Sequence, residues 1–298
     1  MTLKQLEAFY WAATCESFAT AALRLHLSQS SLSKRIGELE ACLGKTLFDR
    51  DQRRARLTPV GRALLPHARQ LLTSAEYIVA TIGSEGDLRG SCRFGVGEIA
   101  ASSWLPRFAA KVKKQFPDLL LEPYVELGRE LEARLIGGEL DFAMIGSRST
   151  HPQLDSQRLA QVQFVWAIAA DVAPSARRAE DAITELPIIS MSKGSGARRI
   201  LDAWMKSQRC EHAAVVTCNN MSSMAGLVAA GLGISYFPRG WLRPLTDKGI
   251  LRVLPSRTPL QKLDYHFHWR VDDTRAYIPR LRGLMASEVD YDVSLLQL

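Results

Sequence analysis

The chain has 298 residues, of which 47% are hydrophobic, so it is long enough for two or three compact domains with proper cores. No apolar run approaches the ~18 residues that a membrane span requires, and the start MTLKQLEAFY is typical of a helix, so we expect a cytoplasmic protein that does not enter membranes. The five cysteines are widely spread and never form a CxxC pair, which indicates neither a disulfide framework nor a zinc site.

Positive charge is concentrated near the N-terminus. The whole chain carries a formal net charge of +7, and residues 24–69 alone contain ten basic and four acidic residues, a net of +6. Most of the excess therefore lies in less than a sixth of the chain. This is the electrostatic footprint expected of a module that contacts phosphates.

The first 44 residues carry three helix patterns. The first runs from about Thr2 to Cys15, and the second begins at Ser17, whose hydroxyl is a suitable N-cap. The third ends at Gly44, a natural residue for the position after a helix. Its apolar stripe, spaced by four, three and four residues, is Leu32, Ile36, Leu39 and Leu43.

The other face of the third helix is small, polar and partly basic. Small side chains let a helix approach base edges, hydroxyl and amide groups can donate or accept, and a lysine can contact a phosphate or a guanine. The candidate DNA-binding residues on this helix are Gln29, Ser30, Ser31, Ser33, Lys34 and Arg35. For the helix taken alone, an ordinary solvated face remains the alternative.

A β wing is predicted after Gly44. Short apolar stretches near residues 46–48 and 55–57 flank the polar, basic loop 49–54. A charge run is usually a solvated loop, but a wing joined directly to a helix pair reaches phosphates or the minor groove. Its candidate DNA-binding residues are Arg50, Arg53, Arg54 and Arg56.

Residues 1–58 resemble the winged helix-turn-helix domain of LysR-type transcriptional regulators. The shared motifs are Leu-x-x-Phe at 6–9, Ser-Phe-x-x-Ala-Ala at 17–22, Leu-His-Leu-Ser-Gln at 25–29, Leu-Phe-x-Arg at 47–50 and Leu-Thr-x-x-Gly at 57–61. Ser30 departs from the proline usual in the family, but serine also fits a first helical turn, so we expect the same fold. The resemblance implies a sequence-specific regulator that binds double-stranded promoter or operator DNA, with RNA polymerase as a further candidate partner.

A long linker helix is predicted over residues 59–88, with Thr58 as its cap and Pro59 at its first position. Its heptad-like seam consists of Val60, Leu64, Ala68, Leu71, Ala75, Ile78 and Ile82. Such a seam suits pairing with a second copy of the helix, and the alternative is a helix packed on its own domain. The resemblance implies a homodimer through this helix and a homotetramer built from two dimers, between which the seam does not distinguish.

Strand and helix patterns alternate from Cys92 onward, which is typical of parallel sheets covered by helices. We expect lobe 1 over residues 89–162 and 268–298 and lobe 2 over residues 163–267, with crossings near Val162 and Phe267. The region 89–298 resembles the periplasmic-binding-protein-like (type 2) effector domain of the same family. Its matching motifs are Leu-Pro at 105–106, Phe-Pro at 116–117, Gly-x-Leu-Asp at 138–141 and LVAAGLGI at 227–234. The predicted fold is therefore multidomain: an all-α winged module, a linker helix and a two-lobed α/β domain.

An effector is expected beyond the carboxyl ends of the strands, where the lobes meet. The loop 97–103 leads into a helix whose free N–H groups favour an anionic group, and two arginines add positive charge. The candidates from these segments are Glu98, Ile99, Ala100, Ser102, Arg129 and Arg148. By resemblance, loop positions that touch the effector are Ser190, Ser192, Asn219 and Met221, with Asn220 and Ser222 beside them.

Glu98 complicates the expectation of an anionic effector. Its carboxylate can satisfy the amides at the helix start, pair with Arg129, or hold an amine of the ligand, and the sequence does not rank these alternatives. An amino-acid-like or otherwise amphoteric effector is therefore predicted, with its identity left open.

Other chemistry has weaker support. The sequence lacks GxSxG, HExxH and a phosphate-binding glycine loop, so no enzyme and no cofactor are expected. A redox role for Cys210 and Cys218 is disfavoured, because the stretch 190–198, where peroxide-sensing members of the family carry a cysteine, has none. His266 and His268 share one strand face without further metal ligands nearby. The second functional class is a small-molecule binding protein or enzyme on the two-lobed fold, with the N-terminal helices serving assembly.

Overall fold

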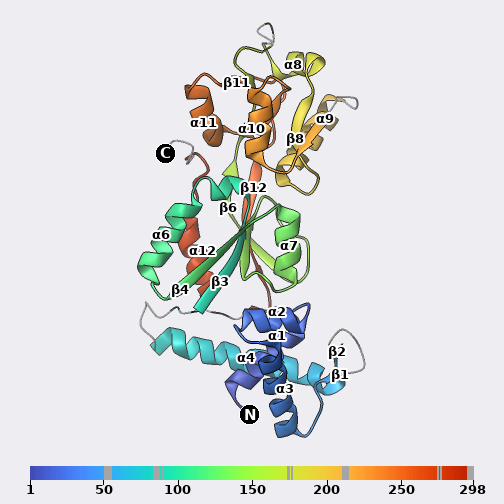
Figure 1. Ribbon diagram of the computed structural model, residues 1–298, viewed down its shortest axis with the longest axis vertical. Coiled ribbons are helices and arrows are strands. Elements are labelled where there is room, and N and C mark those ends of the chain that lie inside the picture. The colour runs from blue at the N-terminus through green and yellow to red at the C-terminus, as the bar shows by residue number, and fades with distance from the viewer. Residues whose placement is uncertain are drawn as a thin grey trace.

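A computed structural model describes residues 1–49, 56–82, 88, 90–172, 175, 177–209, 215–273, 275 and 277–293. The chain forms an N-terminal helical module, a long helix and two α/β lobes, and Figure 1 shows these parts stacked along the longest axis of the molecule. Among the described residues, no helix is long and apolar enough to cross a membrane. The predicted multidomain fold is confirmed.

Three helices build the N-terminal module: α1 (Leu3–Thr14), α2 (Phe18–Arg24) and α3 (Gln29–Leu43). Each begins where a hydroxyl caps it, because the side chains of Thr2, Ser17 and Ser28 accept hydrogen bonds from amides of the first turn. Gly44 ends α3 with a φ of 64°, which glycine adopts without strain. One detail of the predicted stripe is wrong: Leu43 is 38% exposed, because the last turn of α3 extends past the module core.

The wing consists of the antiparallel strands β1 (Phe48–Asp49) and β2 (Arg56–Leu57). Glu40 of α3 fixes the first strand, since its buried carboxylate accepts hydrogen bonds from the amides of Leu47 (2.7 Å) and Phe48 (3.3 Å). Arg50, Arg53 and Arg54, predicted to contact DNA from the tip of the wing, lie outside the described residues.

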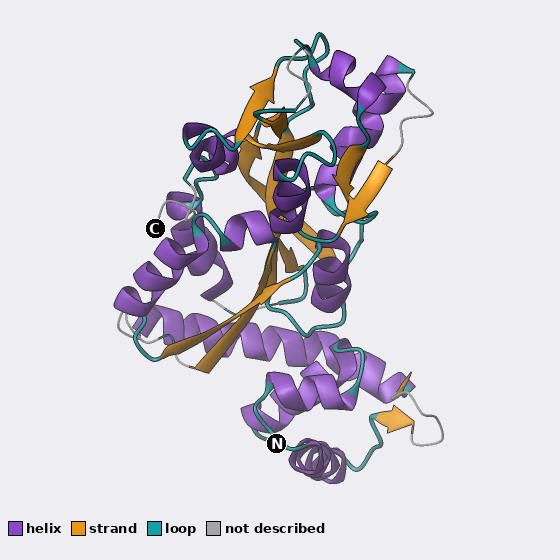
Figure 2. Cartoon of the chain, turned by 45° about the horizontal axis from the view of Figure 1, so that its top comes forward, coloured by secondary structure: helices purple, strands orange, loops and turns teal. Residues whose placement is uncertain are grey.

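The linker helix α4 (Pro59–Ile82) starts as predicted, with the Thr58 hydroxyl accepting a hydrogen bond from the Gly61 amide. Figure 2 shows it running across the base of the first lobe beside the module helices. Ala68 is fully buried against the module, whereas Leu71 and Ile78 are 45% and 56% exposed. One part of the seam thus packs on the module and another faces outward, and pairing of the outward part with a second copy stays a prediction.

Lobe 1 contains a five-stranded sheet in the order β4-β3-β5-β12-β6, with β3 parallel to β4 and β5, and β12 antiparallel to β5 and β6. Its strands are β3 (Gly90–Val96), β4 (Leu119–Val125), β5 (Phe142–Ile145), β6 (Leu154–Val162) and β12 (Leu263–Arg270). Its helices are α5 (Glu98–Ala101), α6 (Leu105–Gln115), α7 (Gly128–Ile136) and α12 (Tyr277–Glu288). Figure 1 shows α6 and α12 on one side of the sheet and α7 on the other.

Lobe 2 contains the antiparallel order β10-β7-β11 and the parallel pair β8-β9, joined by a bridge between Ile188 and Ile234. Its strands are β7 (Phe164–Ala169), β8 (Ile188–Met191), β9 (Val215–Cys218), β10 (Ser235–Pro238) and β11 (Leu251–Leu254). Its helices are α8 (Ala179–Glu185), α9 (Gly196–Gln208), α10 (Met221–Ala229) and α11 (Arg239–Asp247).

The chain returns to lobe 1 earlier than the predicted boundary at residue 268. Strand β12 pairs with β6 along its whole length, beginning with Leu263 opposite Val162. Because β6 ends and β12 begins at the same level of the sheet, the two crossings between the lobes lie side by side. The second crossing therefore falls just before Leu263.

Candidate DNA interface and effector cavity

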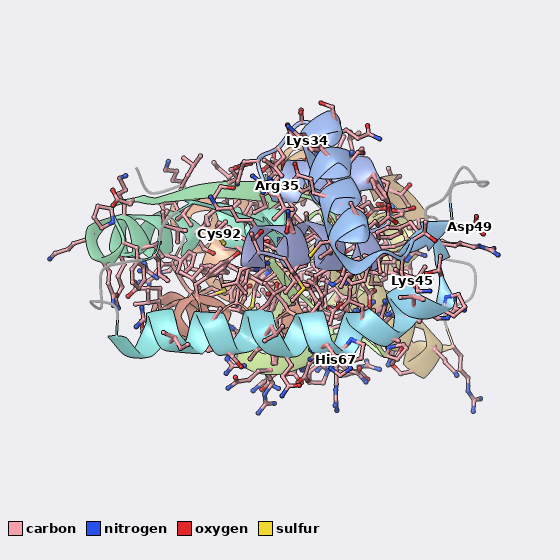
Figure 3. The ribbon with its side chains drawn as sticks, turned by 90° about the horizontal axis from the view of Figure 1, so that it is seen from below. Lys34, Arg35, Lys45, Asp49, His67 and Cys92 are labelled. Atoms are coloured by element: carbon pink, nitrogen blue, oxygen red, sulfur yellow. The ribbon has the colours of Figure 1, made fainter. Side chains whose placement is uncertain are left out.

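The outward face of α3 is open to solvent. The predicted residues Gln29, Ser30, Ser31, Ser33 and Lys34 are exposed, and Arg35 is half-buried. Figure 3 shows Lys34 and Arg35 on α3, with Lys45 and Asp49 toward the wing.

Ser30 and Ser31 are held by the cap of the same helix. The Ser28 hydroxyl accepts a hydrogen bond from the Ser31 amide at 3.1 Å and lies 2.9 Å and 2.8 Å from the hydroxyls of Ser30 and Ser31. Helix α3 therefore begins at Gln29 although serine replaces the proline usual at position 30. The outward face of α3, which we call the reading face, thus carries small side chains, and hydrogen bonds hold those at its N-terminal tip.

The basic side chains near the wing differ in their surroundings. Arg56 of β2 is exposed, as a DNA contact requires. Arg24, which contributes to the positive charge of the N-terminal region, does not face solvent: its guanidinium is buried against Asp141 and Asp273 of lobe 1. Arg24 therefore adds to the net charge of the region but is not placed to contact DNA phosphates.

A cavity of about 500 Å³ lies between the lobes. The carboxyl ends of β3, β4 and β5 form its lobe 1 wall, and the starts of α9 and α10 form its lobe 2 wall. This is the position predicted for an effector in an α/β fold. Four of the ten predicted effector residues line the cavity: Glu98, Ile99, Asn219 and Met221.

The charged side chains that line the cavity among the described residues are carboxylates: Glu98, Glu126 and Glu130. Most of the remaining lining is apolar and includes Leu131 and Tyr265. The Glu126 carboxylate has a distant cationic neighbour, Arg134, at 4.0 Å. The cavity is therefore acidic and apolar.

Glu98 crosses from lobe 1 to lobe 2. Its carboxylate accepts hydrogen bonds from the amides of Met221 (2.5 Å) and Ser222 (3.1 Å) and from the Ser222 hydroxyl (2.6 Å). We call this set of contacts the Glu98 latch. It differs from the predicted alternatives, since Glu98 satisfies the amides of α10 rather than those of its own helix. The anion-favouring start of α10 is thus occupied by a carboxylate of the chain itself.

The other six predicted effector residues do not line the cavity. The Ser190 hydroxyl is fully buried and lies 2.7 Å from the Tyr236 hydroxyl, and Ala100 is part of the core. The Ser102 hydroxyl accepts a hydrogen bond from the Trp241 indole at 3.1 Å, which gives a second link between the lobes. The remaining three are Ser192, whose amide donates to the carbonyl of Cys218, and the exposed Arg129 and Arg148.

Sequence reasoning did not identify Glu126, Gly128 and Glu130 as cavity residues. A usable signal was present, because all three follow β4 directly and its carboxyl end lies beside that of β3. The rule that ligands bind beyond parallel strand ends therefore applies to this segment as well.

The described cysteines and histidines of lobes 1 and 2 form no separate site. Burial raises the pKa of the Cys218 thiol, and Cys210 lies outside the described residues. The rings of His266 and His268 lie 6.0 Å apart, and burial lowers both pKa values, that of His268 to about 4. In the described part of the chain, no group of three or more His, Cys, Asp or Glu side chains is arranged to hold a metal ion.

Comparisons with known proteins agree with this architecture. Residues 3–62 match the family described as "Bacterial regulatory helix-turn-helix protein, lysR family", and residues 85–289 match "LysR substrate binding domain". The HTH-type transcriptional regulator YusT of Bacillus subtilis is 30% identical over 267 residues, which cover 90% of this chain and 89% of YusT. A probable hydrogen peroxide-inducible genes activator of Mycobacterium avium is 30% identical over 242 residues, 80% of this chain and 78% of that protein.

Solved structures show the same fold. Hydrogen peroxide-bound OxyR of Corynebacterium glutamicum, a cysteine mutant, superposes with a TM-score of 0.58 at 28% identity and covers 96% of this chain and 94% of its own. Full-length OxyR of Pseudomonas aeruginosa, also a mutant, has a TM-score of 0.65 at 24% identity, with coverage of 97% and 94%.

Proposed function

Since the chain belongs to the LysR family of transcriptional regulators, we propose that its effector is an organic amine with an apolar portion, and amino-acid-like amines in particular. The protein is a sequence-specific DNA-binding regulator whose promoter binding or activation is modulated by a small molecule between the two lobes of its effector domain. The acidic lining of the interlobe cavity is the observation that supports this class of effector.

An ammonium group suits the three carboxylates of the cavity. Carboxylates in a partly apolar cavity gain from pairing with a cation, whereas a second anion meets like charge. The Glu98 latch already fills the amides of α10. The start of α9, from Ser195 to Ala197, also faces the cavity and suits a carboxylate of an amphoteric effector.

Calorimetry on the full-length protein tests the effector class with three matched compounds: an aliphatic amine, the amino acid of the same chain length, and the carboxylate without the amine. We expect heat of binding for the amine-bearing compounds. Glu130→Gln should weaken it about tenfold or more, since a hydrogen bond to a charged group contributes about 1.5–3 kcal/mol. Glu185→Gln, at an exposed position outside the cavity, is the matched control. Binding of the simple carboxylate alone would contradict the proposal.

For DNA we propose that α3 reads bases and the wing holds phosphates. Replacing Gln29 or Ser33 by alanine should reduce sequence preference more than affinity, by about 1–3 kcal/mol for each base that the variant no longer reads. Neutralising Arg53 and Arg54 should weaken binding to all DNA and lower the salt slope by about one for each phosphate contact. Loss of sequence preference in the wing variant alone would overturn this division.

A salt titration separates this function from a binding protein or enzyme on the same fold. Operator affinity should fall steeply as salt rises, and one promoter should be preferred over random DNA. A flat response without promoter preference would favour the second class. We further propose that the protein is not an enzyme and acts without a cofactor, in the cytoplasm with the DNA, as a homodimer or homotetramer, and contacts RNA polymerase at the promoter.

A response to hydrogen peroxide is not part of the proposed function, although relatives carry that name. The stretch 190–198 contains no cysteine, and the raised pKa of the Cys218 thiol leaves little reactive thiolate. Operator binding measured before and after peroxide treatment should be unchanged.

A further inference from the structure

The helical module is docked on lobe 1 at the end of the sheet opposite the effector cavity, where Figure 1 shows α1 and α2 directly below the lobe. Arg24 of α2 lies at the centre of the contact. Its guanidinium forms ion pairs with Asp141 (3.0 Å) and Asp273 (3.1 Å) and donates to the carbonyls of Gly138 and Leu140. The side chains of Arg24, Asp141 and Asp273 are only 4%, 5% and 0% exposed.

Arg275 completes a buried set of two cations and two anions. It pairs with Asp141 at 2.7 Å and with Asp273, and both guanidinium groups lie over the Trp11 ring, at 4.0 Å for Arg24 and 5.2 Å for Arg275. We call Arg24, Asp141, Asp273 and Arg275 the clasp. Burial alone would raise the pKa of the Asp273 carboxyl, but Arg275 and Arg24 hold it below its ordinary value.

The clasp is complete only when the module is docked, because one of its four charges comes from the module. Removing one partner of a buried ion pair leaves an uncompensated charge and typically costs about 3–5 kcal/mol, whereas full separation returns the charges to water. Undocking therefore removes one of the two cations that pair with Asp141 and Asp273.

Further hydrogen bonds surround the clasp. Arg270 donates to the carbonyl of Thr14 at 2.9 Å, and the Glu16 amide donates to the carbonyl of Gly137 at 3.1 Å. Outside these lie three more contacts, which join His26 to Ser91, Arg69 to the carbonyl of Val271, and Tyr10 to the carbonyl of Asp272. The module is thus held by α1, α2 and α4 together.

Docking leaves the reading face free. The contacts come from α1, from Arg24 and His26 at the end of α2 and from Arg69 of α4, whereas Gln29, Ser33 and Lys34 of α3 are exposed. The docked module is therefore able to present its recognition helix.

Elements of lobe 1 that hold the clasp also reach the cavity. Asp141 precedes β5, whose last residue Ile145 lines the cavity, and Asp273 follows β12, whose first residue Leu263 lines it. Helix α7 starts at the cavity with Gly128, and its C-terminal end leads to the carbonyl of Gly138 that Arg24 contacts. Three elements, β5, β12 and α7, thus run from the cavity to the clasp.

We propose that the clasp is a coupling joint: the docked module and lobe 1 move as one body, so that a change at the effector cavity reorients the recognition helix through lobe 1. This proposal rests on the proposed function, because it assumes that an effector binds in the cavity and starts the movement there. It does not depend on the class of the effector.

The joint is tested by an uncoupling variant and a perturbation of the cavity that needs no effector. Glu98→Gln weakens the latch, and Arg24→Met opens the clasp while keeping an apolar side chain of similar length over Trp11. We expect Glu98→Gln to change the length of the operator footprint or the bend angle of the DNA in the wild-type background, and to change neither in the Arg24→Met background. An equal effect in both backgrounds, or none in the wild-type background, would overturn the proposal.

A cross-link restores docking and keeps the test valid if Arg24→Met alone is poorly folded. A Cβ at Gly138 would lie 2.7 Å from the Cys15 Sγ and 3.5 Å from its Cβ, which fits the Cβ separation of about 3.5–4.5 Å in a disulfide. Gly138→Cys therefore lets oxidation tie the module to lobe 1 through Cys15. Since Gly138 has a φ of 79°, Gly138→Ser is the control that carries the same backbone strain without the thiol.

In the Arg24→Met, Gly138→Cys protein, oxidation should restore the footprint response to Glu98→Gln, and reduction should abolish it again. Oxidised Gly138→Cys alone should bind the operator within about twofold of wild type, a difference of about 0.4 kcal/mol. Loss of operator binding on oxidation, recovered on reduction, would show that docking inhibits the module and would overturn the proposal. Operator binding by the wild type and binding of amines, measured in parallel, report on the proposed function separately.

Discussion

Acid should destabilise the effector domain over a pH range set by His268. This residue on β12 is 1% exposed, and burial lowers its pKa to about 4. Its Nε2 lies 2.7 Å from the Ser147 carbonyl, so the Nε2 hydrogen is donated there, and its Nδ1 has no hydrogen-bond partner among the described residues. A second proton on Nδ1 would create a buried cation without an acceptor, beside the ring of His266 and with Glu132 as a weaker opposing charge.

The magnitude follows from the difference between the folded and unfolded pKa values. An unfolded histidine titrates near about 6.5, so between that pH and about 4 the unfolded chain binds more protons and stability falls as the pH falls. At about 1.4 kcal/mol for each pKa unit, the loss between pH 7 and pH 5 is about 2 kcal/mol, and it approaches about 3 kcal/mol below pH 4.

Urea unfolding of the full-length protein at pH 7 and pH 5 measures this loss. His268→Gln keeps a donor for the Ser147 carbonyl but does not titrate, so its free energy of unfolding should depend on pH by about 2 kcal/mol less than that of wild type. His67→Gln, at an exposed position on α4, should keep the wild-type dependence. The reasoning fails if the pH dependence of His268→Gln equals that of the control.

Three further changes test the packing and assembly of the molecule. Glu40→Ala removes the acceptor of two wing amides and should lower the free energy of unfolding by about 2–3 kcal/mol in urea, whereas the exposed Glu38→Ala should change it by less than about 0.5 kcal/mol. Gly240→Ala places a Cβ 2.2 Å from the backbone of the C-terminal segment and should lower the melting temperature, whereas Gly283→Ala meets nothing within 4 Å on a helix and should raise it. Leu71→Glu puts a charge on the outward face of α4 and should reduce the mass found by sedimentation to that of a monomer; an unchanged mass would exclude this face from assembly.

The N-terminal module was predictable because its signals are local. The caps Thr2 and Ser17 and the stop at Gly44 each act within four residues along the chain, and they fix three helices almost to the residue. The wing strands follow for the same reason. The predicted burial of Leu43 was wrong, because the apolar stripe of α3 continues beyond the end of the module core.

Strands β6 and β11 were not predicted, β6 because of its burial pattern and β11 because it is short and follows a turn. Strand β6 runs along the edge of its sheet and is largely half-buried or exposed, so its sequence LDSQRLAQV lacks the apolar alternation of a strand with one covered face. Strand β11 has only four residues and begins directly after the turn at Gly249. Tertiary pairing, rather than local propensity, makes both of them strands.

The partners of charged side chains were the least predictable part of the site. Arg24 contributes to the local positive charge of a DNA-binding region, but its carboxylate partner Asp273 lies 249 residues away. Glu98 begins a helix, yet the amides it binds lie 123 and 124 residues away. Such contacts are set by the fold of the whole chain, and no spacing in the sequence encodes them.

The Glu98 latch determines which groups an effector needs in order to move the lobes. A ligand shifts the lobes only by the difference between its affinities for the two arrangements, so an ammonium that draws Glu98 away has to compensate for the hydrogen bonds that Glu98 leaves. Their donors are two amides of α10 and the Ser222 hydroxyl, all at the edge of the cavity. The Met221 amide is partly buried, and leaving a buried donor without an acceptor costs about 1–3 kcal/mol, whereas the exposed amide and hydroxyl of Ser222 can bind water instead. An amphoteric effector provides an acceptor in its own carboxylate, and for that reason we expect an amino acid to shift the lobes further than an amine of the same size.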